Sequence, residues 1–147
     1  MAYITNSDIE SWIGPAAYVQ LTDDAGSGSA NAARVDEARL GAEGEANSYL
    51  AARYAVPVDL TSEPEVRSVL RCFVLDLAAY RLHSRKPPVP GDVVRRREEA
   101  VTWLARVASG LVQLPSSLAL RSNTALGISG ESAPADRAMT RDTLNGI

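Results

Sequence analysis

One segment of this sequence is strongly constrained to form a helix buried along one side. Its apolar residues recur at intervals of three and four positions, which places them on one face of an α-helix: they are Val66, Val69, Leu70, Phe73, Val74, Leu77, Ala78 and Leu82. Pro64 suits the first turn, where its missing N–H does no harm, and Ser62 is the expected N-cap. The sequence therefore predicts a core helix from Pro64 to about Leu82.

The same reasoning predicts further helices on both sides of this one. A short helix runs from Asn6 or Ser7, as its cap, to Gly14, and Pro15 opens a second turn that runs to about Leu21. A second long helix spans residues 31–54, and Asp92 caps a last helix that ends at Gly110. Aromatic residues are only 5% of the chain, which favours helices packed through small side chains. We expect an all-α protein, a small bundle of about four helices with two long core helices.

The two glycines inside the second long helix call for an explanation. Gly41 and Gly44 each cost about 1 kcal/mol relative to Ala in a helix interior. A close helix crossing or a bend is the expected reason. A glycine clamp on nucleic acid is the alternative, but such a clamp lies in a loop between helices.

The character of the chain changes after Gly110. Residues 111–147 are rich in Ser and Thr and show no sustained periodicity, so we expect a helical domain over 1–110 and an extended arm over 111–147. Spaced apolar residues within the arm, Leu118, Leu120 and Leu126 among them, favour a segment that becomes ordered on a partner. A flexible tail is the simpler alternative.

Charge is divided unevenly between the two halves. Residues 1–65 carry three basic and eleven acidic side chains, whereas residues 66–147 carry twelve and seven. Such opposite halves suit copies that meet head to tail. Two separately solvated faces explain the division equally well.

The residues that usually carry catalysis or bind metal are sparse. His83 is the only histidine and follows the core helix, where it suits the negative end of the helix dipole, and Cys72 is expected to be a small packed side chain. Asp23 and Asp24 precede glycines as in a calcium loop, but the alternating oxygen ligands and the final Glu are missing. We therefore expect no catalytic site, no cofactor and no metal, in a chain that is not an enzyme.

Arg95, Arg96 and Arg97 form the sharpest basic feature. Phosphate contact is the functional interpretation, and it supports an alternative function as a small DNA-binding protein without sequence specificity. Arg95 and Glu99 are spaced for a helical ion pair, which favours a solvated or inter-subunit role instead. No apolar stretch reaches the roughly 18 residues of a membrane span, and no signal peptide is recognisable.

Six segments in order along the chain resemble the Mu-type phage and prophage head–tail connector family. They are the opening M-A-Y-I-T, Y-V-Q-L-T-D (18–23), Y-L-A-A-R-Y-A-V-P-V (49–58), D-L-A-A-Y-R-L (76–82), R-R-R-E-E-A-V-T-W-L (95–104) and T-R-D-T-L-N-G (140–146). The family's loop after L-T-D is usually more acidic, and Ala25 and Ser27 stand here where acids are common.

The resemblance implies a structural neck protein of the virion, assembled in the host bacterial cytoplasm. Its partners would be the portal protein, neighbouring copies in a ring of twelve, the next neck or tail-completion protein, and genomic DNA passing through the channel. The resemblance also implies that the arm reaches the portal. Its expected contact residues there and on neighbouring subunits are Leu118, Leu120, Leu126, Met139, Arg141, Asp142, Leu144 and Ile147.

Overall fold

The computed structural model describes residues 2–115, 118 and 120, and in this part of the chain it contains five α-helices and no strand. The expected all-α bundle is confirmed, with one helix more than predicted because the turn after Pro15 extends to eight residues. None of the described helices has the length and apolar character that a membrane crossing needs. The helices are α1 (Asn6–Ile13), α2 (Pro15–Thr22), α3 (Ala32–Leu50), α4 (Pro64–Ser84) and α5 (Gly91–Ser109).

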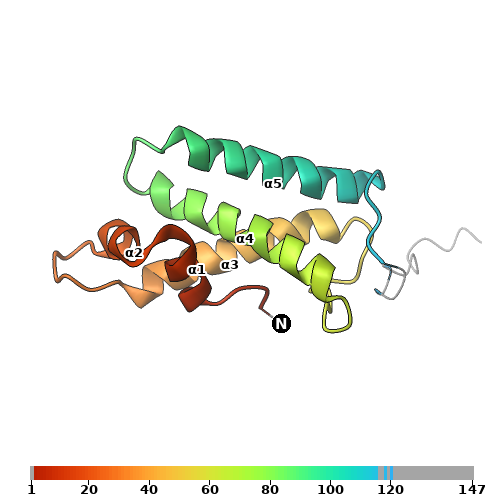
Figure 1. Cartoon of the computed structure of the whole chain (residues 1–147), viewed down its shortest axis with the longest axis horizontal. Helices are drawn as coiled ribbons and strands as arrows, with labels where there is room; N and C mark the ends of the chain where they lie inside the picture. The colour runs from red at the N-terminus through yellow and green to blue at the C-terminus, as the bar shows by residue number, and fades with distance from the viewer. Residues whose placement is uncertain (1, 116–117, 119, 121–147) are drawn as a thin grey trace, which may run out of the picture.

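Three long helices form the body of the molecule. α3 and α5 run in one direction and α4 runs in the other, and each of the three packs against both of the others (Figure 1). The short helices α1 and α2 pack against each other and against α3 and α4. The connection from α2 to α3 and the connection from α4 to α5 therefore lie at the same end of the bundle (Figure 1).

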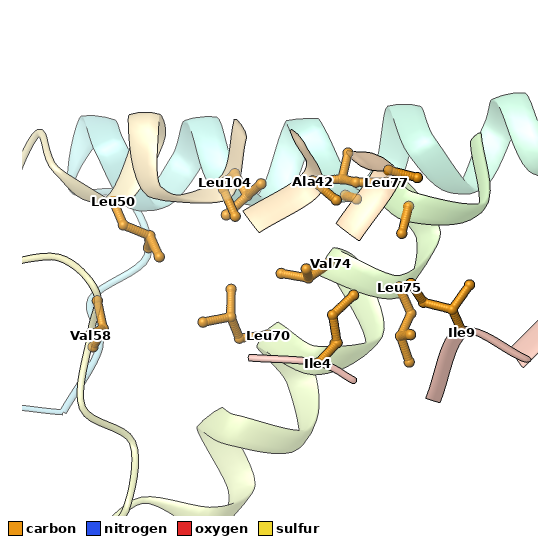
Figure 2. Close-up of a cluster of buried hydrophobic side chains, with 14 of the residues drawn as sticks. Ile4, Ile9, Ala42, Leu50, Val58, Leu70, Val74, Leu75, Leu77 and Leu104 are labelled. Atoms are coloured by element: carbon orange, nitrogen blue, oxygen red, sulfur yellow. The ribbon is translucent and has the colours of Figure 1, made fainter. Parts of the chain in front are cut away.

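The periodic stripe of α4 supplies the centre of the core. Leu70, Val74, Leu77, Ala78 and Leu82 are fully buried, as predicted. Figure 2 shows Ala42 next to Leu77, with Leu104 farther along the same row and Val74 and Leu70 below them. The helix begins at Pro64 as expected, but the predicted cap was wrong, because Glu63 holds the N-cap position and no side chain caps the helix.

Two other helix starts also differ from the prediction. Thr5, rather than Asn6 or Ser7, caps α1 in a reciprocal capping box with Asp8. α5 begins at Gly91, so Asp92 lies in its first turn instead of capping it.

The remaining helix ends follow local chemistry. Asn31 caps α3 by accepting hydrogen bonds from the main-chain N–H groups of Ala33 and Arg34. α3 ends at Leu50, four residues before the predicted end. Gly110 terminates α5 in the left-handed conformation, as expected.

The two tryptophans mark two different helix contacts. Trp12 of α1 donates a hydrogen bond from Nε1 to Asp76 Oδ1 of α4 at 3.0 Å. Trp103 of α5 stacks near Phe73 of α4, with ring centroids 4.9 Å apart. Asp76 is only 9% exposed, so it is buried although it lies off the main apolar stripe.

Candidate functional site

Charges from the acidic and basic halves of the sequence pair within one folded chain. Four ion pairs join an acid of residues 1–65 to an arginine of residues 66–147. Ion pairs within one chain therefore account for part of the uneven charge division between the two halves of the sequence. The pairs are Asp8–Arg71, Asp24–Arg85, Glu45–Arg81 and Glu45–Arg97.

Glu45 is the centre of this network, because it links the three long helices. Its Oε2 accepts from Arg81 of α4 at 2.8 Å and its Oε1 accepts from Arg97 of α5 at 3.1 Å. The Arg97 guanidinium also lies over the Tyr80 ring, 4.7 Å from its centroid. Two guanidinium groups are thereby held in place by contacts on more than one side.

Gly41 leaves the space that Arg81 occupies. A Cβ at position 41 would lie 2.8 Å from Nη1 of Arg81, which is closer than such atoms approach. The expected close helix crossing or bend was wrong for Gly41, because the group that approaches it is the end of the Arg81 side chain and not a second backbone. A Cβ at Gly44 would meet no atom within 4 Å, so no packing contact explains that glycine.

These arginines line a surface hollow of about 440 Å³, which we call the basic hollow. It lies between α3, α4 and α5 near the α4–α5 connection. Four arginines outnumber two glutamates around it, so it can accept an anionic group. Its charged lining consists of Arg34, Glu37, Glu45, Arg81, Arg85 and Arg97.

The arginine triplet on α5 does not act as one patch. Arg95 lies 3.8 Å from Glu99, the helical ion pair that the spacing predicts, and its side chain is 71% exposed. Arg96 lies 3.9 Å from Asp92. Arg97 turns instead toward Glu45 and contributes to the basic hollow. The structure thus separates three residues that the sequence groups together.

The loop between α2 and α3 uses its carboxylates internally. Asp23 accepts main-chain hydrogen bonds from Gly28 and Ser27, and these hydrogen bonds lower the pKa of its carboxyl. Asp24 pairs with Arg85 and Arg34, and the Arg85 hydrogen bond lowers its pKa. Among the described residues there is no group of three or more His, Cys, Asp and Glu side chains able to hold a metal ion.

The N-terminal segment is held by a buried carboxylate on α3. Glu43 is 8% exposed, and its Oε1 accepts from the main-chain N–H of Tyr3 at 2.8 Å and of Ile4 at 3.2 Å. The Tyr3 hydroxyl donates to Asn47 and accepts from the main chain of Val58. No sequence pattern identified Glu43, because its partners lie about forty residues away.

His83 and Cys72 occupy different environments. His83 lies in the last turn of α4, beside a small hollow whose lining includes Asp76, Asp92 and Arg96. Cys72 is exposed on α4, so its predicted packed position was wrong. Nothing in the structure assigns chemistry to either residue.

The start of the predicted arm packs on the helical domain. Leu114 and Leu118 are buried in the core, and the main-chain N–H of Leu114 donates to the Tyr54 hydroxyl at 2.9 Å. Leu120 pairs with Tyr54 in an isolated antiparallel bridge but remains 65% exposed. The other predicted contact residues lie outside the described part of the chain: Leu126, Met139, Arg141, Asp142, Leu144 and Ile147.

Comparison with known proteins gives one family. A family model described as Bacteriophage Mu, Gp36 matches residues 3–127. This range contains all five described helices, the basic hollow and the segment that packs on Tyr54. A search of curated proteins found no match.

Proposed function

The chain belongs to the Bacteriophage Mu Gp36 family, and we propose that it is a head–tail connector subunit of a tailed bacteriophage. Membership makes it a phage protein of the structural and morphogenetic kind. In our proposal, twelve copies form a ring that binds beneath the portal and extends the DNA channel. The family match over most of the chain is the single observation that carries this proposal.

The surfaces of the protein support an assembly role. The basic hollow offers fixed guanidinium groups to an anionic partner, and Leu111 and Leu120 are exposed apolar side chains beyond α5. Exposed leucines at the start of a terminal segment suit a contact with another protein. The proposed partners are the portal, neighbouring copies, the next neck or tail-completion protein, and DNA contacted without sequence specificity.

Electron microscopy of particles, with the protein labelled, tests the location. We expect label at the neck and a closed ring of copies around the channel axis. A particle that assembles and joins heads to tails without this protein would overturn the proposal.

A truncation tests the role of the C-terminal residues. Because Leu114 and Leu118 are buried in the core, the informative cut follows Leu120 and not Gly110. We expect residues 1–120 to keep the helical circular dichroism of the full chain and to lose binding to purified portal. Portal binding equal to that of the full chain would show that residues 121–147 are dispensable for docking.

DNA binding through Arg95–Arg97 is the alternative function. Each arginine already faces a carboxylate, so fewer cations are free to contact phosphates than the sequence alone indicates. Fluorescence anisotropy with duplex DNA at low salt decides between the connector and the DNA-binding function. Tight, salt-sensitive binding that an Arg95, Arg96, Arg97 triple Ala variant abolishes would favour the alternative.

A further inference from the structure

A second, smaller hollow lies where α1 and α2 meet the second half of α4 and the start of α5. Its volume is about 170 Å³, below the roughly 300 Å³ at which pockets for small-molecule ligands usually begin. It therefore suits the end of a single side chain. Much of its wall is apolar, and we call it the Asp76 hollow. The polar side chains around it are Asp76, His83, Asp92 and Arg96.

Asp76 is the buried acid of this hollow, and only one of its oxygens has a hydrogen-bond partner. The residue is 9% exposed, and its Oδ1 accepts the indole N–H of Trp12 at 3.0 Å. Oδ2 accepts no hydrogen bond from the described residues. Among these residues no fully buried side-chain oxygen lacks a partner, so Oδ2 reaches the surface that Asp76 contributes to the hollow.

No cation of the described residues forms an ion pair with Asp76. Arg96 lines the same hollow, but its guanidinium lies 3.9 Å from Asp92 instead. Burial raises the pKa of the Asp76 carboxyl, and the hydrogen bond from Trp12 and the charge of Arg96 offset that effect only in part. A neutral acceptor would satisfy Trp12 without the cost of burying a charge, so the fold gives no reason for a carboxylate here. A ligand of positive charge does.

We propose that the Asp76 hollow binds the side chain of one lysine or arginine that another protein chain presents. Such a side chain carries a charged head on an apolar stem. The head would donate a charge-assisted hydrogen bond to Asp76 Oδ2, with the exposed Asp92 as a second acceptor. The stem would pack on Trp12 and Ile13, which also line the hollow. This site goes beyond the proposed connector role and does not depend on a ring.

An anionic ligand suits the Asp76 hollow poorly. Asp76 and Asp92 outnumber Arg96 around it, and Glu99 adds a negative charge close enough to act on Asp76. A phosphate placed there would meet net repulsion. The Asp76 hollow therefore differs in charge from the basic hollow, and DNA is not its ligand.

Two kinds of protein chain can supply the basic side chain. A neighbouring copy offers Arg67, near the start of α4, and Arg106, in the last turn of α5. Both are exposed, and neither forms an ion pair within the described part of the chain. They lie at the ends of α4 and α5 that are far from the Asp76 hollow, so they can reach it only in a second copy. A different protein of the particle is the other source.

NMR titration with n-butylguanidinium, an analogue of the arginine side chain, tests the site. The Trp12 indole N–H donates to Asp76, so its chemical shift reports on that carboxylate, and Trp103 serves as the internal reference. We expect a saturable shift of the Trp12 signal alone. n-Butylurea has nearly the same shape without the charge and should give no saturable shift. Equal responses to the two compounds, or no response to n-butylguanidinium, would overturn the proposal.

Three variants separate this site from general charge effects. Asp76→Asn keeps an acceptor for Trp12 but removes the charge, and should weaken binding of n-butylguanidinium at least about tenfold, the loss of one charge-assisted hydrogen bond. Arg96→Gln removes the competing cation and should tighten binding. Glu98→Gln removes an exposed carboxylate of α5 outside the hollow and should leave binding unchanged. Binding seen only in the Arg96 variant would show that Arg96 itself fills the hollow, which contradicts an external ligand.

The same Trp12 signal identifies the source of the basic side chain. A change that grows with protein concentration, and that a double variant with Arg67→Gln and Arg106→Gln loses, identifies a neighbouring copy. A change that appears only when purified portal is added identifies a different protein. A signal unaltered in both experiments, together with Asp76→Asn protein that joins heads to tails as well as the wild type does, would overturn a basic side chain as the natural ligand.

Discussion

The centre of the bundle and the basic hollow join the same three helices by different means. At the centre, Leu70, Leu77 and Leu104 are fully buried and contribute through the apolar area they remove from water. At the basic hollow, Glu45 binds two arginines whose side chains are 35–41% exposed. Apolar burial has no preferred direction, whereas an ion pair fixes the position of each charged group.

The two regions contribute very different amounts to the stability of the fold. A fully buried leucine contributes about 1.5–3 kcal/mol by burial, whereas a partly exposed ion pair contributes about 0–1 kcal/mol. The centre therefore decides whether the three helices fold together. The ion pairs at the basic hollow fix where the guanidinium groups lie on the surface, and so which partners the surface can bind.

Removing side-chain volume at the centre should have the largest effect. Leu77→Ala leaves a cavity at a site with no exposure, and we expect it to lower the free energy of unfolding by about 2–5 kcal/mol in urea denaturation. Leu40→Ala on α3, where the leucine is 59% exposed, is the matched control and should change it by less than about 0.5 kcal/mol. Equal effects of the two substitutions would contradict the division between centre and surface.

The buried carboxylate of Glu43 tests whether a polar contact can contribute as much to the free energy of unfolding as a leucine at the centre does. Glu43→Ala removes the acceptor of the Tyr3 and Ile4 N–H groups, and we expect a loss of about 1–3 kcal/mol. The amides of these two residues should also exchange with deuterium faster than in the wild type. Glu37→Ala, at an exposed position of the same helix, should leave both measurements unchanged; unaltered exchange in the Glu43 variant would show that the N-terminal segment is held by other contacts.

Asp76 provides a smaller test that depends on pH. Burial raises the pKa of its carboxyl, and the hydrogen bond from Trp12 and the charge of Arg96 only partly oppose this, while Glu99 adds to it. The folded chain thus holds the proton more tightly than the unfolded chain. Asp76 therefore favours folding below its ordinary pKa and penalises it as the pH rises above that value.

Asp76→Asn should remove this penalty and keep the acceptor for Trp12. We expect the variant to match or exceed the wild type in stability at pH 7, because Asn keeps the acceptor for Trp12 without a buried charge. The advantage should shrink toward pH 3, and thermal unfolding across this range measures it. If the stability of the variant relative to the wild type is lower at pH 7 than at pH 3, the direction given for the Asp76 pKa shift is wrong.

The smallest effects are expected within the arginine triplet. Arg97→Gln breaks the Glu45 pair and the contact with Tyr80, and should cost about 1 kcal/mol at most. Arg95→Gln removes only an exposed helical pair and should cost less than about 0.5 kcal/mol. Denaturation curves at low and high salt measure both, and only the Arg95 pair should lose its contribution almost completely in high salt.

Local patterns in the sequence predicted most of the fold. The spacing of Leu70, Val74 and Leu77 and the position of Pro64 depend only on neighbours within a turn or two, so they identified α4 and its start. Cap positions were less predictable, because several polar residues compete at each helix start. At α1, the reciprocal bonds between Thr5 and Asp8 favour a start one position earlier than the predicted caps.

The candidate site was predictable only where its contacts are local. The Arg95–Glu99 pair follows from helical spacing. Glu45 binds partners 36 and 52 residues away, and no local spacing in the sequence identifies those partners. The glycine at position 41 suggested a close helix crossing or a bend, but the folded structure shows that the end of the Arg81 side chain fills the space.

The placement of the two tryptophans gives the molecule two separate optical reporters. Trp12 lies 39% exposed against the Asp76 carboxylate at the α1–α4 contact, and Trp103 lies beside Phe73 at the α4–α5 contact. Since the chain contains no other tryptophan, Trp12→Phe leaves emission from one helix contact alone. Intrinsic fluorescence can therefore follow the docking of the short N-terminal helices and the closure of the long bundle as two distinct signals, without any added dye.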